Sequence, residues 1–140
     1  MRHKLCWMVI AVVLVSCGHK SAPTPEMGEQ PPRLENLHYE LTGPALKLEF
    51  VLRGDSAGVG YQIDRAEIDP ICKCPTMWQR YFEQPPYPSQ VGERQTRLLN
   101  LRTLDRTYLF RIRAFDAHGR LGAWSKPIRA QAVDLLKEHP

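Results

Sequence analysis

The chain has 140 residues, of which 43% are hydrophobic and 24% are charged, and its formal net charge is +4 at pH 7. This length suits one compact domain. The charge falls short of the concentrated basic face that a nucleic-acid partner requires, so we expect no such partner.

The N-terminus has the layout of an export signal. Arg2 and Lys4 precede an apolar run from Leu5 to Val15. As a helix this run would reach about 16 Å, against roughly 30 Å for the hydrocarbon core of a bilayer. It is too short to span a membrane, but a basic start followed by such a run is typical of a signal peptide, here residues 1–16.

The apolar run ends on Leu14-Val15-Ser16-Cys17, which resembles the lipobox of bacterial lipoproteins. The resemblance implies cleavage before Cys17, a diacylglycerol on its thiol and an acyl chain on the new amine. Three acyl chains hold a protein stably at a membrane. Gly18 stands where the family's inner-membrane retention signal has Asp, so the implied location is the outer membrane, facing the periplasm. The alternative is an ordinary export signal with a chance cysteine.

The mature chain divides into a tether, one domain and a tail. Cleavage would remove two of the 19 basic residues and none of the 15 acidic ones, which leaves a net charge of about +2. Residues 17–32 hold the lipidated cysteine and a tract with four prolines, a composition typical of a semi-extended tether. The rest shows no internal repeat, which predicts a single domain at 33–133 and a tail at 134–140.

Short alternating runs separated by turn signals predict an all-β sandwich from Arg33 onward. The clearest runs are 46–53 and 108–114, in which every second residue is apolar. We expect these runs to bury Leu46, Leu48, Phe50 and Leu52, and Tyr108, Phe110, Ile112 and Ala114. Further strands are predicted near 34–42 and at 60–67, 94–101 and 124–133. Between them, residues 69–93 carry five prolines and are expected to be irregular, with at most a short strand at 78–82.

Two stretches resemble the F and G strands of a fibronectin type III domain: LDRTYLFRIRA at 104–114 and GRLGAWS at 119–125. The resemblance covers residues 33–133 and implies an immunoglobulin-like sandwich of about seven antiparallel strands. It implies that the Tyr108 hydroxyl bonds the backbone near the preceding turn. The family's strand-B tryptophan is absent, so Phe50 or Leu48 must fill that volume, and the insertion at 69–93 is longer than the family needs.

No pattern in the mature chain indicates catalysis, a metal or a cofactor. Its histidines (His19, His38, His118 and His139) fall in separate segments, and the hydrolase, metalloprotease and phosphate-loop motifs are absent. Small sandwiches of this class are usually scaffolds or binding modules. We therefore expect a non-catalytic protein.

Two groups of residues are candidates for a binding surface. Arg111 and Arg113 share one strand face beside Trp124, where guanidinium groups can stack on the indole. Such a stack binds a partner or, as is more usual, only shields the sheet. The segment WQRYFEQPPY contains Trp78, Tyr81, Phe82 and Tyr87; these aromatic residues form a recognition surface, or Trp78 and Phe82 cover the open edge of the sandwich.

Cys72 and Cys74 are the remaining thiols of the mature chain. In an extended strand their Cα atoms would be about 6.6 Å apart, near the upper limit for a disulfide. A turn imposed by Pro70 and Pro75 would shorten that distance, so we favour a disulfide. The alternative is a metal or redox pair, although two ligands do not complete a zinc site and the usual redox motif is Cys-x-x-Cys.

Together these features predict a lipoprotein anchored by Cys17 that presents a non-catalytic binding or scaffold module in the cell envelope. The expected partners are the membrane and an envelope protein or glycan. Two alternatives stay open: an accessory subunit that docks onto an envelope complex or enzyme, and a thiol or metal protein that uses Cys72 and Cys74.

Overall fold

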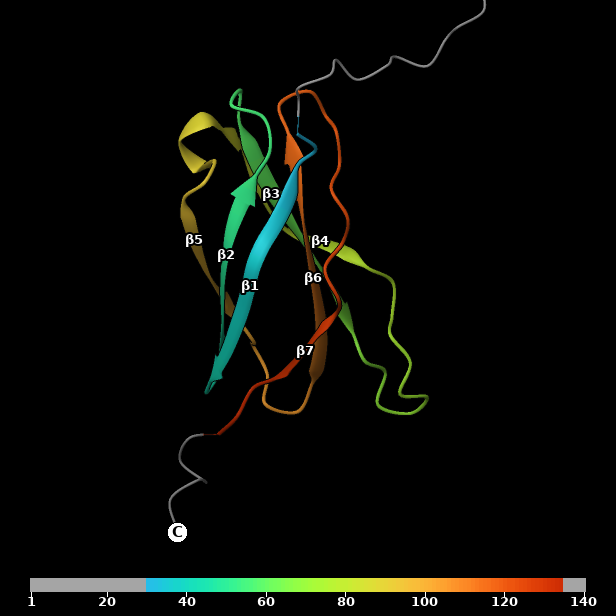
Figure 1. The fold of residues 1–140 in the computed structure, drawn as a ribbon. Helices are drawn as coiled ribbons and strands as arrows, with labels where there is room; N and C mark the ends of the chain where they lie inside the picture. Colours follow the sequence, from blue (N-terminus) through green and yellow to red (C-terminus); the bar gives the residue numbers. More distant parts are fainter. Residues whose placement is uncertain (1–29, 135–140) are drawn as a thin grey trace, which may run out of the picture.

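The structure, a computed structural model, describes residues 30–134. The predicted signal peptide, Cys17 and most of the predicted tether lie outside the described residues. The elements follow in the order β1 (Arg33–Thr42), β2 (Ala45–Arg53), β3 (Val59–Glu67), β4 (Gln79–Tyr87), the 3-10 helix η1 (Pro88–Gln90), β5 (Arg94–Asn100), β6 (Thr107–Asp116) and β7 (Ile128–Gln131). The strands form two antiparallel sheets, β1-β2-β5 and β4-β3-β6-β7, which face each other (Figure 1). The predicted all-β sandwich is confirmed.

The core lies between the two sheets and is supplied mainly by the alternating faces of β2, β3 and β6. All eight residues predicted to be buried on β2 and β6 are buried. Phe50 packs edge-on against Tyr61, with ring centroids 4.9 Å apart. Burying one large apolar side chain contributes about 1.5–3 kcal/mol. This continuous cluster therefore lets residues 30–134 fold as one unit.

Residues 69–93 contain more regular structure than predicted. Instead of at most a short strand at 78–82, the structure has β4, a strand of nine residues that includes Pro85 and Pro86. A strand can hold proline at the edge of a sheet or at a bulge, and β4 offers both. It pairs only with β3, and the register shifts near Gly60. A Cβ atom at Gly60 would lie 2.3 Å from the carbonyl oxygen of Gln84, so only glycine lets the proline-bearing strand come this close.

The predicted strand at 124–133 is also too long, because β7 begins only at Ile128. Pro127 precedes it and has no N–H group to donate to a ladder. Ser125 still attaches the segment to β6. Its N–H group donates to the carbonyl oxygen of Ile112 at 2.8 Å, and its hydroxyl accepts from the Ile112 N–H group at 3.1 Å.

Tyr108 is buried at the start of β6, as predicted. Its hydroxyl lies 3.3 Å from the Thr103 hydroxyl in the preceding turn. The expectation that this hydroxyl bonds the backbone is therefore wrong. The turn brings a side-chain hydroxyl, rather than a peptide group, within reach of the tyrosine.

The chain enters the sandwich at one end, and the loop between β3 and β4 leaves it at the other (Figure 1). Pro32 lies at the entry end, where its backbone comes close to Gly54 and Gly122. The β3–β4 loop begins after Glu67, which pairs with Tyr108 at the opposite end of β6. The β3–β4 loop and the point where the chain enters the domain thus lie at opposite ends of the sandwich.

Candidate functional site

Four of the seven predicted surface residues meet on the outer face of the four-stranded sheet. Arg111 and Arg113 point outward from β6, because alternate residues of a strand face opposite ways. Trp124 lies beside them, held in place by the two hydrogen bonds that connect Ser125 to β6. Trp78 reaches the same place from the end of the β3–β4 loop.

These four residues form a continuous stack of alternating rings and guanidinium groups, which we call the Arg–Trp stack (Trp78, Arg111, Trp124 and Arg113). The guanidinium carbon of Arg111 lies 4.4 Å from the ring centroid of Trp78 and 4.1 Å from that of Trp124. The guanidinium carbon of Arg113 lies 4.2 Å from the Trp124 centroid. All three distances are within the range for cation–π attraction. Arg113 therefore forms one end of the stack.

A buried carboxylate supports the middle of the Arg–Trp stack. Asp64 on β3 is only 7% exposed. It accepts hydrogen bonds from Arg80 at 2.7 Å and from Arg111 at 3.1 Å, which offset the cost of burying its charge. Glu83 completes the group as a second acidic partner of Arg80.

Arg113 differs from the other two arginines because it forms no ion pair with a residue in the range 30–134. Burial lowers the pKa of its guanidinium, as does repulsion from Arg80 and Arg111, whereas attraction to Asp64 partly opposes these effects. Asp64 and Glu83 form their ion pairs with Arg80 and Arg111. Arg113 is thus the arginine of this group without an ion pair of its own.

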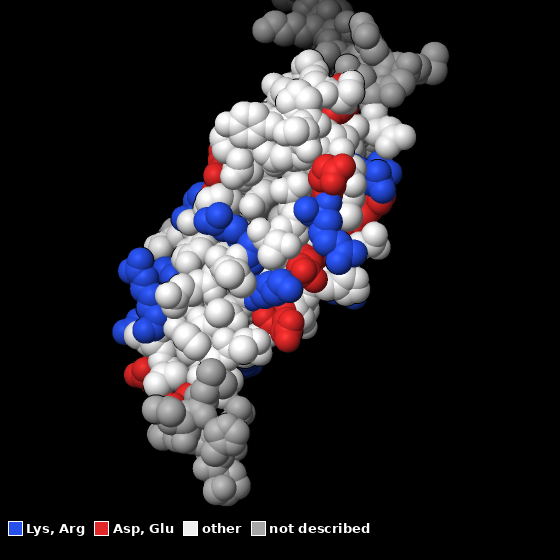
Figure 2. Space-filling model, turned by 90° about the vertical axis from the view of Figure 1, so that its left-hand side faces the viewer, with Lys and Arg blue, Asp and Glu red and all other residues white. Residues whose placement is uncertain are grey.

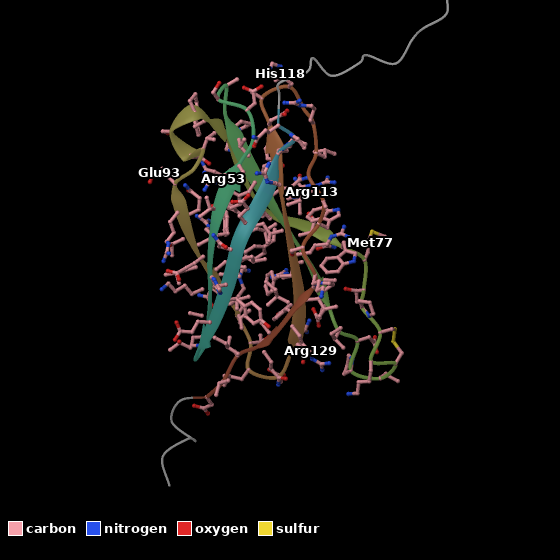
Figure 3. All side chains as sticks on the ribbon, in the orientation of Figure 1. Arg53, Met77, Glu93, Arg113, His118 and Arg129 are labelled. Atoms are coloured by element: carbon pink, nitrogen blue, oxygen red, sulfur yellow. A yellow bond between two sulfur atoms is a disulfide. The ribbon has the colours of Figure 1, made fainter. Side chains whose placement is uncertain are left out.

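On the side of the molecule with β5 at its edge, basic and acidic side chains are interspersed (Figure 2). Figure 3 labels Arg113, which belongs to β6 of the other sheet. What distinguishes Arg113 is its place at the end of the Arg–Trp stack.

Tyr81 and Phe82 do not belong to this surface, because a register shift on β4 turns both toward the sandwich. Tyr81 packs edge-on against Phe110, with centroids 5.7 Å apart. Arg97 of β5 stacks over Phe82 at 3.5 Å and so closes the open side between the two sheets. Of the two residues expected to cover the open edge, Trp78 and Phe82, Phe82 lies there.

Trp78 and Tyr87 do not cover the open edge of the sandwich, and they lie in two different places. Trp78 stacks on the outer face instead of covering the edge. Tyr87 is 49% exposed and pairs with Val59 at the entry end of the sandwich, at the far end of β4 from Trp78. The segment 78–87 is therefore divided among three locations and is not one aromatic cluster.

The predicted disulfide between Cys72 and Cys74 is present, with the Cα atoms 5.2 Å apart. The distance is shorter than in an extended strand because Lys73 adopts a left-handed conformation, with φ of 57°. Asp69 sets up the turn: its carboxylate accepts from the N–H groups of Ile71 and Cys72 at 2.8 and 3.0 Å. The turn thus owes more to Asp69 than to the flanking prolines.

Within the part of the chain that the structure describes, no group of three or more His, Cys, Asp or Glu side chains is arranged to hold a metal ion. The same part contains no helix that is long and apolar enough to cross a membrane. In comparisons with known proteins, the chain matches no family model and no curated protein.

Proposed function

We propose that the chain is a lipid-anchored lipoprotein of the bacterial cell envelope that presents a non-catalytic, fibronectin type III-like binding module. The motif LVSC at 14–17 supports the anchor. Two observations support the module: the three-on-four antiparallel sandwich and the position of the buried Tyr108 at the start of β6.

The observation that carries the binding role is the position of Arg113 at the end of the Arg–Trp stack. Its guanidinium group is partly desolvated and is repelled by Arg80 and Arg111, against a partial attraction to Asp64, so an incoming anion would be attracted to it. Trp124 holds one face of the guanidinium group at 4.2 Å, and the buried Nε atom has no hydrogen-bond partner among the described residues. Arginine and tryptophan are also the residue types that most often dominate binding energy at protein interfaces.

The surroundings of Trp124 favour an acidic protein surface as the partner. A groove of about 290 Å³ next to the stack is lined by Leu34, Leu37 and Ala123, with Arg33 and Trp124 also on its wall. Apolar walls beside the Arg–Trp stack suit a segment that combines an aliphatic side chain with a carboxylate. Charge-assisted hydrogen bonds to arginine then orient that carboxylate.

A pull-down from detergent-solubilised envelope tests the proposal with two matched variants. Arg113→Ala removes the charge at the end of the stack, whereas Arg129→Ala removes an exposed arginine of β7 from the same sheet. We expect the wild type and Arg129→Ala to retain one stoichiometric protein that Arg113→Ala loses. Equal retention by all three proteins would contradict the assigned surface. Enrichment of peptidoglycan or another glycan would instead indicate that the module binds the cell wall rather than an acidic protein.

A further inference from the structure

The loop between β3 and β4 has features that the binding role does not use. It projects from the sandwich (Figure 1) and carries the sulfur–sulfur bond (Figure 3). Every residue from Ile71 to Met77 is exposed. Both sulfur-bearing residues are thus open to attack by a thiol of another molecule, which is the first requirement for exchange.

The backbone of this loop is held without help from the disulfide. The Lys73 N–H group donates to the carbonyl oxygen of Asp69 at 3.0 Å, and the Asp69 N–H group donates to that of Cys74 at 2.9 Å. At its base, the Thr76 N–H group donates to the carbonyl oxygen of Glu67 at 2.8 Å. A bridge across a single residue also restricts the unfolded chain very little. Opening the disulfide therefore costs the fold little, and the two thiols remain close enough to re-form it.

Two groups favour release of Cys72 as a thiolate, and one opposes it. The Cys74 N–H group donates a hydrogen bond to Sγ of Cys72 at 3.3 Å, and such a bond stabilises a developing negative charge on that sulfur. The Asp69 carboxylate, which accepts from the Cys72 N–H group at 3.0 Å, opposes that charge, but it is itself attracted by Lys73, which lies between the two cysteines. A sulfur that leaves more readily makes its partner, Cys74, the one that is attacked.

Two large apolar side chains of this loop are almost fully exposed: Ile71, which precedes Cys72, and Met77, which lies apart from the disulfide near the start of β4 (Figure 3). Ile71 is 91% exposed and Met77 is 82% exposed, the highest values among the large hydrophobic residues of the described chain. Next to an accessible disulfide, Ile71 provides a contact for a polypeptide whose own apolar residues are not yet buried.

We propose that Cys72–Cys74 is an exchangeable disulfide that oxidises pairs of thiols in incompletely folded polypeptides. One client thiolate attacks Sγ of Cys74, the bond to Cys72 breaks, and the Cys72 thiolate takes a proton from water. The second client thiolate attacks the client sulfur of this mixed disulfide and releases Cys74, which is protonated in turn. The client loses two electrons and two protons, and the Cys72–Cys74 pair gains them. This activity goes beyond the binding role and does not depend on it.

The test uses residues 18–140, which include the whole sandwich and in which Cys72 and Cys74 are the only cysteines. The probes are a synthetic dithiol peptide with leucines around its cysteines and a matched peptide with serines instead. Intact mass follows the reaction, since the protein gains 2 Da for the two hydrogens it takes up while the peptide loses as much, as the two-electron exchange requires. We expect both peptides to be oxidised, the leucine peptide faster.

Four variants separate the steps of the proposal. Ile71→Ser should slow oxidation of the leucine peptide about three- to tenfold, as expected for losing part of an aliphatic contact. It should leave the serine peptide unaffected. Leu98→Ser, which removes an exposed leucine of β5, should change neither rate. Cys72→Ser should be inert toward both peptides, and Lys73→Glu should slow both.

Three results would overturn the proposal. The first is a protein that stays oxidised in the presence of both peptides. The second is that the two peptides are oxidised at the same rate and that Ile71→Ser leaves this rate unchanged. That result would refute the claim that the loop binds apolar residues of the client. The third is a large drop in the urea midpoint when both cysteines are replaced by serine, because the bridge would then be a structural support.

Discussion

Replacing Phe110 by alanine tests the assignment of the two faces of β6. Phe110 is 1% exposed, and its ring packs 5.7 Å from Tyr81 and 6.3 Å from Tyr108, measured between centroids. Truncating a buried phenylalanine costs about 3–5 kcal/mol. Because an aromatic pair adds about 0.5–1.5 kcal/mol beyond burial, we expect a loss near the upper end of that range. A domain of this kind has about 5–15 kcal/mol in total, so the variant should be largely unfolded or close to it.

Trp124→Ala is the matched comparison on the outer face. Its ring contacts the guanidinium groups of Arg111 and Arg113, and each such contact is worth about 0.5–1 kcal/mol at a partly exposed site. We therefore expect a loss of about 1–2 kcal/mol. Urea denaturation of both variants, analysed with a common slope, measures the difference. A larger loss for Trp124→Ala than for Phe110→Ala would show that the faces are assigned the wrong way round.

Three further predictions address the anchor, the buried carboxylate and an exposed ion pair. Cys17→Ala should abolish acyl labelling and detergent partitioning; unchanged labelling would refute the lipobox assignment. Asp64→Asn should lower stability by about 1.5–3 kcal/mol, because two charge-assisted hydrogen bonds are weakened, whereas Glu83→Gln, at an exposed pair, should cost at most about 1 kcal/mol; urea melts that reverse this order would contradict the burial of Asp64. Arg53 and Arg33 lower the pKa of Glu35 from 4.5, so its contribution to stability is present above that pH and is lost as the pH falls below it. Glu35→Gln should therefore destabilise at neutral pH but not in acid, and an equal effect at both pH values would exclude this ion pair as the cause.

The alternating strands could be predicted from the sequence because one face of each is fully buried. In β2 and β6 the pattern of every second residue leaves one arrangement that places Phe50 and Phe110 in a core. Cys72 and Cys74 could also be predicted, since a separation of two residues limits how they can be arranged. These features depend on local order along the chain.

The features that could not be predicted from the sequence depend on contacts between distant segments. Pro85 and Pro86 indicate a loop in isolation, but a bulge opposite Gly60 accommodates them in β4. Trp78 joins Arg111 only because β3 and β4 pair in a particular register. Asp64 looks like an ordinary residue on the polar face of a strand, although Arg80 and Arg111 bury it. No local pattern encodes such pairings, so the Arg–Trp stack becomes visible only in three dimensions.

Photo-crosslinking in intact cells is the most direct test of the proposed binding surface. A photoreactive amino acid would replace Ala123 next to Trp124, Arg129 on β7 or Leu98 on β5, one position at a time, so that Arg113 stays in place. All three positions are exposed, and Ala123 lines the groove beside the Arg–Trp stack. We predict one adduct of defined mass from position 123 that is weak or absent from 129 and 98. The same adduct from all three positions, or none from position 123, would contradict the claim that this outer sheet face binds a partner.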